Sequence, residues 1–398
     1  MRVEYAPSMS PSITERTYFA ACGLGLEPAL AGELKDLGAG QVREKRGGVS
    51  FRGDRALGYR ASLWLRSAIR IQEQLLSRRV VTADDLYAAA TELDWRPWVD
   101  PDRTFAIQAS VRDTPQIRHS GFAALRVKDA IVDQMRQHHG RRPSVDTKHP
   151  DVPLKLVVKD GHMLLYRDWS GASLHKRGWR PIQVKSPLNE ALAAGLLLLS
   201  DWDRQSPLAD PMCGSGTFPI EAAMLAADIA PGLQRSFSFE QWPDHDRDLW
   251  RHVRDEAVAN ARPELGFAIE GSDHHPGAVG LARKGAEAAG VGRLVRFHQN
   301  DARDFVPAET PSVVVTNPPY DKRLGEGEDV IGTWKSLGNF LHQQCAGATA
   351  YVLSGNKKLT MHLGLRASSR TPIMNGPIDC RWIKYEIRAR KPAKDEGA

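Results

Sequence analysis

The feature that most constrains the fold is the alternation of short apolar runs with helical segments after residue 206. Four runs have the length and composition of buried strands, and helical segments at 217–227 and up to 289 follow the first two. Such alternation is typical of a parallel, doubly wound α/β sheet, which binds ligands at the carboxyl ends of its strands. The expected strands are 207–210, 267–271, 295–298 and 312–316.

The first half of the chain has a different pattern. A strand near 18–22, a leucine-spaced helix, a hairpin around Gly47-Gly48 and a helix at 54–67 come first. Later come a strand at 104–111, a helix at 127–135 and a hairpin formed by 154–158 and 163–167. This order predicts small α+β units rather than one large sheet. A Gly-rich, basic and aromatic connector follows at 168–186, and Ser186-Pro187 is expected to start the next helix.

The balance of basic and acidic residues also differs between the two halves of the chain. Residues 1–186 carry 30 Lys and Arg against 21 Asp and Glu, whereas residues 187–398 carry 24 against 27. A basic first half indicates contact with a polyanion, and the alternative is a solvated basic surface.

Several classes of protein are disfavoured. No apolar run approaches the roughly 18–20 residues of a membrane span, and the N-terminus is polar, without a secretory core. The four cysteines form no CxxC pair, so we expect neither a disulfide scaffold nor a metal site, and a cytoplasmic location.

A glycine-containing turn follows the first expected strand. Its sequence is Asp210-Pro211-Met212-Cys213-Gly214-Ser215-Gly216-Thr217. Glycines at a strand-to-helix turn let the backbone approach a bound nucleoside closely, although a purely structural turn remains the alternative. The acid before the loop would repel a pyrophosphate, whereas it suits the cationic cofactor S-adenosylmethionine.

The second motif, Asn317-Pro318-Pro319-Tyr320, follows the apolar strand 312–316. An exocyclic base amine is a poor nucleophile, and hydrogen bonds to the Asn317 side-chain oxygen and the Pro318 carbonyl would localise and aim its lone pair. Attack on a methyl group then depends mainly on proximity and orientation. Pro318 and Pro319 stiffen the loop, and Tyr320 would stack on the base. A rigid loop exit is the structural alternative.

Two further acids are candidate cofactor ligands. Asp273 follows the second strand and is placed to bind ribose hydroxyls, with Glu270 as its rival. Asp301, followed by Ala302, comes after the third strand and would accept from the adenine amine. Either acid could instead cap the next helix.

Together these motifs resemble the THUMP-containing methyltransferases, specifically the bacterial 23S rRNA guanine-N2 methyltransferases. The resemblance covers about residues 19–324 and includes the segments 127–133, 174–180, 227–233 and 239–242. His274-His275 departs from the acidic or small residues usual after Asp273. Some relatives carry a second methyltransferase domain, which this chain is too short to contain, so only the N2 activity is expected.

The resemblance implies a Rossmann-like methyltransferase domain preceded by an α+β ferredoxin-like and THUMP region that captures RNA. The implied division is a disordered tail at 1–16, a ferredoxin-like element at 17–56, a THUMP domain at 57–167, a linker at 168–186, the methyltransferase domain at 187–390 and a disordered tail at 391–398. The candidate RNA contacts are Arg118, Arg126, Lys128, Lys176, Arg177 and Arg180.

Three alternatives stay open. The Asn-Pro-Pro-Tyr motif also serves DNA adenine-N6 and protein glutamine-N5 methyltransferases, although the basic first half disfavours a protein substrate and the resemblance disfavours DNA. A related THUMP enzyme would act on guanosine in tRNA. An RNA-binding protein without catalysis would not need Asp210, Asp273, Asp301 and Asn317 together.

Overall fold

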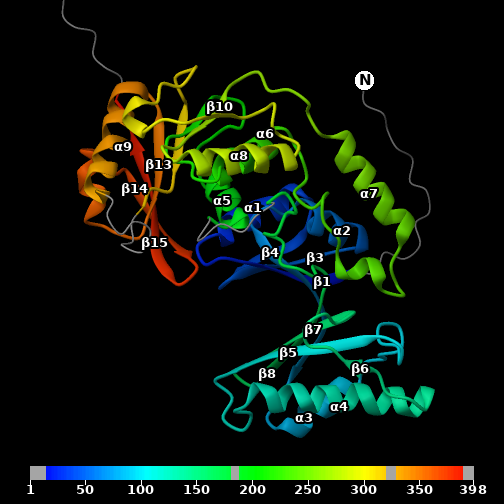
Figure 1. The fold of residues 1–398 in the computed structure, drawn as a ribbon. Helices are drawn as coiled ribbons and strands as arrows, with labels where there is room; N and C mark the ends of the chain where they lie inside the picture. The colour runs from blue at the N-terminus through cyan, green and yellow to red at the C-terminus, as the bar shows by residue number, and fades with distance from the viewer. Residues whose placement is uncertain (1–14, 181–187, 320–328, 389–398) are drawn as a thin grey trace, which may run out of the picture.

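A computed structural model describes residues 15–180, 188–319 and 329–388. Two sheets organise the chain, one in each half (Figure 1). The elements of the first half are β1 (Arg16–Cys22), α1 (Glu27–Asp36), β2 (Gly40–Lys45), β3 (Gly48–Gly53), α2 (Arg55–Trp64), β4 (Ala68–Arg79), α3 (Ala83–Thr91), β5 (Thr104–Arg112), α4 (Ser120–His139), β6 (Ser144–Val145), β7 (Val152–Lys159) and β8 (His162–Asp168).

The second half begins with α5 (Glu190–Leu198). The remaining elements are β9 (Leu208–Asp210), α6 (Thr217–Ala226), η1 (Ser238–Gln241), α7 (Arg247–Ala259), β10 (Ile269–Ser272), α8 (Pro276–Ala288), β11 (Arg296–His298), η2 (Ala302–Asp304), β12 (Val313–Thr316), α9 (Val330–Gln344), β13 (Thr349–Ser354), η4 (Leu359–Leu363), β14 (Ser369–Asn375) and β15 (Ile378–Glu386).

Strand β4 joins the two parts of the first half into one sheet. The first residues of β4 pair with β1, up to Glu73. From Gln72 onward β4 pairs with β8, so at Gln72 and Glu73 it has a partner strand on each side. The hydrogen-bonded order is β2-β3-β1-β4-β8-β7-β5-β6. The expectation of separate small sheets is therefore wrong, because one 12-residue strand serves both units. The boundary predicted between residues 56 and 57 falls inside α2, so a division along β4 fits the fold better.

Segment 169–180 is packed rather than free. Trp169, Leu174, Arg177 and Trp179 are all buried. The Trp169 ring lies in an aromatic cluster with rings from both halves of the chain, namely Tyr18, Tyr59, Phe239 and Trp242. The predicted linker is thus part of the core that joins the halves, at least over its described residues.

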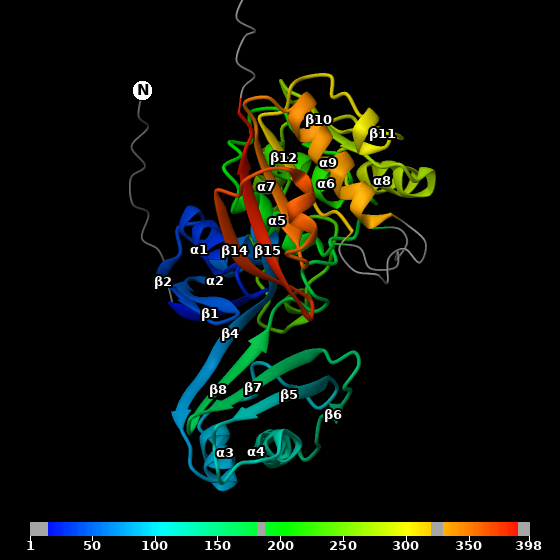
Figure 2. The same cartoon turned by 90° about the vertical axis from the view of Figure 1, so that its left-hand side faces the viewer.

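The second half contains a seven-stranded sheet with the order β11-β10-β9-β12-β13-β15-β14. Strands β11, β10, β9, β12 and β13 run parallel, as predicted, and all four expected strands are present. The strands β15 and β14 add antiparallel pairing at the far edge (Figure 2). The sheet is thus mixed. Helix α5 begins at Glu190 with Asn189 as its cap, after the predicted Ser186-Pro187 start, which lies outside the described residues.

A buried ion cluster fastens the first half to the segment between α6 and α7, called here the insertion after α6. Arg167, 1% exposed, contacts Glu73 at 2.8 Å and Asp244 at 3.0 Å, and its guanidinium lies 3.9 Å from the centre of the Trp242 ring. Burial alone would raise the pKa of Glu73, but Arg167 and Arg16 hold it below its ordinary value.

Replacing Arg167 with Met should therefore leave Glu73 buried without its main partner and reduce the free energy of unfolding by about 3–5 kcal/mol. Urea denaturation measures the loss. Arg96→Met removes an exposed pair with Asp94 and should leave stability nearly unchanged. Equal stability of the two variants would show that the cluster does not fasten the halves.

Candidate active site

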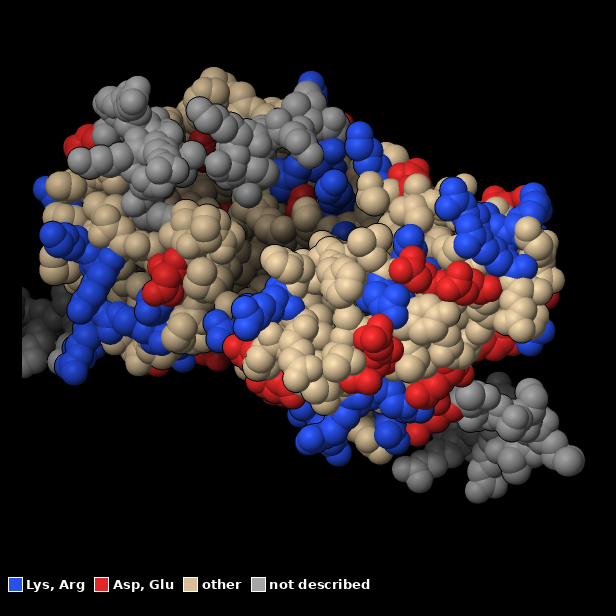
Figure 3. Space-filling view, turned by 90° about the horizontal axis from the view of Figure 1, so that it is seen from below, with Lys and Arg blue, Asp and Glu red and all other residues tan. Residues whose placement is uncertain are grey.

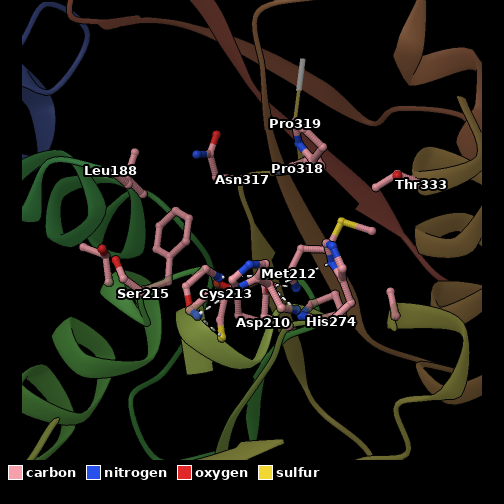
Figure 4. Close-up of a pocket in the computed structure, with 18 of the residues that line it drawn as sticks. Leu188, Asp210, Met212, Cys213, Ser215, His274, Asn317, Pro318, Pro319 and Thr333 are labelled. Carbon is pink, nitrogen blue, oxygen red and sulfur yellow. Dashed lines mark hydrogen bonds and ion pairs between the residues drawn. The ribbon is translucent and has the colours of Figure 1, made fainter. Parts of the chain in front are cut away.

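Parallel pairing of β9 with β12 brings the two sequence motifs to one edge of the sheet. Val313 lies opposite Leu208 and Val314 opposite Ala209, so Asp210 and Asn317 stand at neighbouring strand ends. The strand order reverses here, and open α/β sheets bind ligands at such points. A cavity of about 1270 Å³ opens at this edge (Figure 4). Because ordinary ligand sites measure roughly 300–1000 Å³, it has room for a cofactor and part of a second molecule.

Most of the predicted site residues line this cavity. In Figure 4, Asn317 and the two prolines stand on one side and Met212, Cys213 and Asp210 on the other. The predicted residues that line it are Asp210, Pro211, Met212, Cys213, Gly214, Thr217, Asp273, Asp301, Ala302, Asn317, Pro318 and Pro319. Tyr320 lies outside the described residues.

The two glycines of the turn have different surroundings. Gly214 and Gly216 both have left-handed backbones, with φ of 55° and 81°. No atom lies within 4 Å of a Cβ added at Gly214, whereas one at Gly216 would lie 2.8 Å from the Ala282 Cβ. Gly214 therefore leaves open space above the cavity. Gly216 does not line the cavity and instead allows α6 to pack against α8.

Asp273 rather than Glu270 faces the cavity. Its carboxylate accepts a hydrogen bond from the Gly214 backbone N–H at 2.9 Å and is 14% exposed, which ties the end of β10 to the glycine turn. Glu270 is buried and accepts from the Ala308 backbone N–H at 2.8 Å, and its other oxygen lies 2.9 Å from the His298 ring. The Glu270 carboxylate is thus occupied by partners within the fold, and Glu270 does not line the cavity.

Asp210 is buried at the base of the cavity, with 1% exposed area. Its pKa is raised to about 7, mainly by burial and to a smaller extent by the nearby Asp273, against a hydrogen bond from the Met212 backbone N–H. The carboxyl group therefore changes charge near neutral pH. A cationic ligand would favour its ionised form.

Asp301 lines the cavity and also caps η2. Its carboxylate accepts from the Arg303 backbone N–H and from Nε of the same residue, both at 3.0 Å. Burial would raise the pKa of Asp301, but these contacts hold it below its ordinary value. The capping role considered from the sequence is present, and a role toward adenine stays a prediction.

The Asn317 loop presents an unpaired acceptor. Among the described residues, the buried Asn317 Oδ1 has no hydrogen-bond partner. An unsatisfied buried polar atom costs free energy, and a ligand donor would relieve that cost. The indole N–H of Trp334 in α9 donates to the Pro319 carbonyl at 2.8 Å and so anchors the loop. Sequence reasoning missed Trp334, because it lies 15 residues beyond Pro319.

The predicted RNA contacts fall into two groups. Arg177 is 3% exposed and bound to Glu221 and two backbone carbonyls, so its prediction as an RNA contact is corrected. Arg180 donates to Glu190 at 2.7 Å, and to Ser215 and Thr217 at 3.0 Å, so it braces the glycine turn.

The remaining four candidates reach the surface. Arg118 and Lys176 are exposed, whereas Arg126 and Lys128 are half-buried and paired with Asp84 and Asp129. On the face seen in Figure 3, Lys and Arg gather on more than one side of a hollow. A role of these four in binding RNA stays a prediction.

No group of three or more His, Cys, Asp or Glu side chains within residues 15–180, 188–319 and 329–388 could hold a metal ion. No helix in those ranges is long and apolar enough to cross a bilayer.

Comparison with known families matches three domain models. Residues 17–72 match an RlmL ferredoxin-like domain, 80–168 a THUMP domain and 177–384 an RMKL-like methyltransferase domain. These matches confirm the family and the fold class expected from the motifs.

Individual relatives agree with these models. A Synechocystis protein named as a candidate RNA methyltransferase is 41% identical over 94% of this chain and 98% of its own length. A large-subunit ribosomal RNA methyltransferase K/L of Syntrophotalea carbinolica is 39% identical over 94% of this chain but 54% of its own length. The chain thus spans about half of the K/L proteins. A candidate methyltransferase solved with S-adenosylhomocysteine (SAH) has a TM-score of 0.85 at 28% identity, covering 95% of this chain and 99% of that one.

The different roles of the two glycines predict different effects of substitution. Gly216→Ala adds a close contact with Ala282 to the strain of a left-handed backbone, and should cost about 1–3 kcal/mol beyond the cost at Gly214. Gly214→Ala should cost about 1 kcal/mol, for the backbone strain alone. Thermal unfolding measures both, and a Gly214→Ala protein as unstable as Gly216→Ala would contradict the assignment.

Proposed function

Since the chain belongs to the RMKL-like methyltransferase family, we propose that it transfers a methyl group from S-adenosylmethionine to N2 of a guanosine in large-subunit ribosomal RNA. The observation that carries this proposal is the unpaired Oδ1 of Asn317, a residue that lines the same cavity as the glycine turn. The family match supports the reaction class, and the K/L relatives support the ribosomal substrate.

The residues of the glycine turn fit the proposed cofactor. The open space above Gly214 leaves room for a nucleoside against the backbone. Asp210 supplies a carboxyl group whose ionised form a cationic ligand would stabilise. Asp273 is held at the rim by Gly214 and can still accept from ribose hydroxyls through its exposed edge. SAH bound to the 28% identical structure supports the same cofactor class here.

The chain's own groups act chiefly by orientation. S-adenosylmethionine supplies an electrophilic methyl group on a sulfonium. Asn317 Oδ1 and the Pro318 carbonyl would accept the two N–H bonds of the amine, which localises its lone pair and stabilises the positive charge that develops on nitrogen. Trp334 fixes the Pro319 carbonyl, so these acceptors stay in place.

The assignment of guanine N2 in ribosomal RNA as the target needs more support than the assignment of the reaction class. The paired acceptors of the Asn317 loop suit any exocyclic amine, including adenine N6. The THUMP match and the basic first half support an RNA substrate, and the K/L names support the large subunit. The most direct test of the substrate assignment compares 23S rRNA, tRNA and duplex DNA as methyl acceptors, with mass spectrometry of the digested nucleosides. N2-methylguanosine in 23S rRNA is expected, and N6-methyladenosine or tRNA-restricted transfer would overturn the substrate assignment.

Asn317→Ala should lower the rate of transfer by at least about 100-fold, because it removes the acceptor that aims the amine. Binding of RNA should stay largely unchanged. Asn260→Ala, the same change at the exposed end of α7, is the control. Single-turnover transfer from tritium-labelled cofactor measures the rate, and wild-type turnover by Asn317→Ala would contradict the role.

The raised pKa of Asp210 predicts pH-dependent binding of the cofactor. Below about 7 the carboxyl is protonated and neutral, so its attraction for the sulfonium is lost. The affinity for S-adenosylmethionine should thus rise by up to about tenfold between pH 6 and pH 7.5.

Calorimetric titration checks this dependence, with two controls. SAH lacks the sulfonium charge and should show a weaker dependence, and Asp210→Asn should remove it. An unchanged slope in Asp210→Asn would assign the pH dependence to another group.

A further inference from the structure

The hairpin of β14 and β15 reaches past the sheet that supports it. The last β13 residue, Ser354, pairs with Arg381, so residues 375–380 of the hairpin extend beyond the carboxyl edge. Its turn, residues 375–378, lines the cavity beside the Asn317 loop. Because β13 and β15 lie on the β12 side of the switch point, the turn borders the part of the cavity farthest from β10 and β11.

The first half of the chain supports this overhang. The Met374 backbone N–H donates to the Leu24 carbonyl at 3.0 Å, in the turn between β1 and α1. Gly25 in that turn has a φ of +96°, and an added Cβ would lie inside contact distance of the Pro372 carbonyl and 2.9 Å from Ile373 Cδ1. Backbone therefore lies directly against backbone at this contact. Figures 1 and 2 both show the hairpin beside α1.

The base of the hairpin is fixed from inside the sheet. The Trp382 ring stacks on Phe218, which lines the cavity, with centroids 5.7 Å apart, and on Tyr351 at 5.4 Å. The ferredoxin-like part is also packed directly on α5, because a Cβ at Gly195 would lie 2.8 Å from the Leu26 methyl groups. The turn between β1 and α1 is thus a rigid support rather than a loose neighbour.

We propose that the β14–β15 turn positions the target nucleotide, and that docking of the β1–α1 turn holds it over the cavity. This proposal rests on the proposed function, because the nucleotide that the hairpin would position is the one whose amine Asn317 binds. Pro377 and Ile378 offer an apolar surface to the base or ribose. The ferredoxin-like domain then affects the rate of methyl transfer itself, in addition to any role in capturing RNA.

Gly25→Ala tests this proposal, with Gly38→Ala as the matched control. Gly38 also has a left-handed backbone, with a φ of +79°, but no atom lies within 4 Å of its added Cβ. Both variants carry the same kind of backbone strain, and only Gly25→Ala pushes against the hairpin. A displacement near 1 Å at a reacting centre can cost about 100-fold in rate, so Gly25→Ala should slow single-turnover methyl transfer to 23S rRNA by at least about tenfold.

Binding measurements separate this effect from a general loss of structure. Gly25→Ala should bind SAH and the 23S rRNA fragment as the wild type does, and Gly38→Ala should transfer at the wild-type rate. A second variant does not touch the domain contact: Ile378→Ala shortens the turn's apolar surface and should also slow transfer. Val258→Ala, an exposed position on α7, is its control.

The outcomes distinguish the two proposals. If the wild type binds SAH and RNA but transfers no methyl group, the proposed function fails. If the wild type is active and both Gly25→Ala and Ile378→Ala transfer at the rates of their controls, the positioning role of the hairpin is overturned. If Gly25→Ala fails to fold, an unimpaired Ile378→Ala alone overturns it.

Discussion

The parallel pairing of β9 with β12 is the constraint on which the candidate site depends. Only two residue pairs join these strands, Leu208 with Val313 and Ala209 with Val314. All of β9 and β12 is buried, so packing on both faces keeps this short contact in register. The pairing sets Asp210 beside Asn317, and the reversal of strand order beside them leaves the cavity open. A slip of one residue in either strand would turn the side chain of that strand away from it.

The two halves of the chain share more structure than their sequences indicate. Arg167 and Trp169 bind the first half to the insertion after α6, and the β1–α1 turn meets the last hairpin. Both contacts join residues far apart in the chain, and both use buried groups or backbone. An RNA-binding region attached in this way would deliver its substrate in a fixed orientation, which suits a reaction that depends on orientation.

The local motifs could be predicted from the sequence, whereas the long-range packing could not. The glycine turn, the Asn317 loop and Asp273 each follow an apolar strand, so their common edge followed from the alternation of elements. Arg177 was misread because its partner, Glu221, lies 44 residues away and charge alone does not reveal burial. The continuous first sheet depends on a single long strand with a bulge near Leu75. Trp334 and the hairpin turn reach the site only through tertiary packing.

The most direct measurement is a crystal structure of the protein with SAH and a short guanosine-containing fragment of 23S rRNA. We expect the cofactor over Gly214 and the guanine amine about 3 Å from Asn317 Oδ1, at the edge where β9 and β12 end. A guanine amine held elsewhere in the cavity, with Asn317 turned toward protein groups, would contradict this expectation.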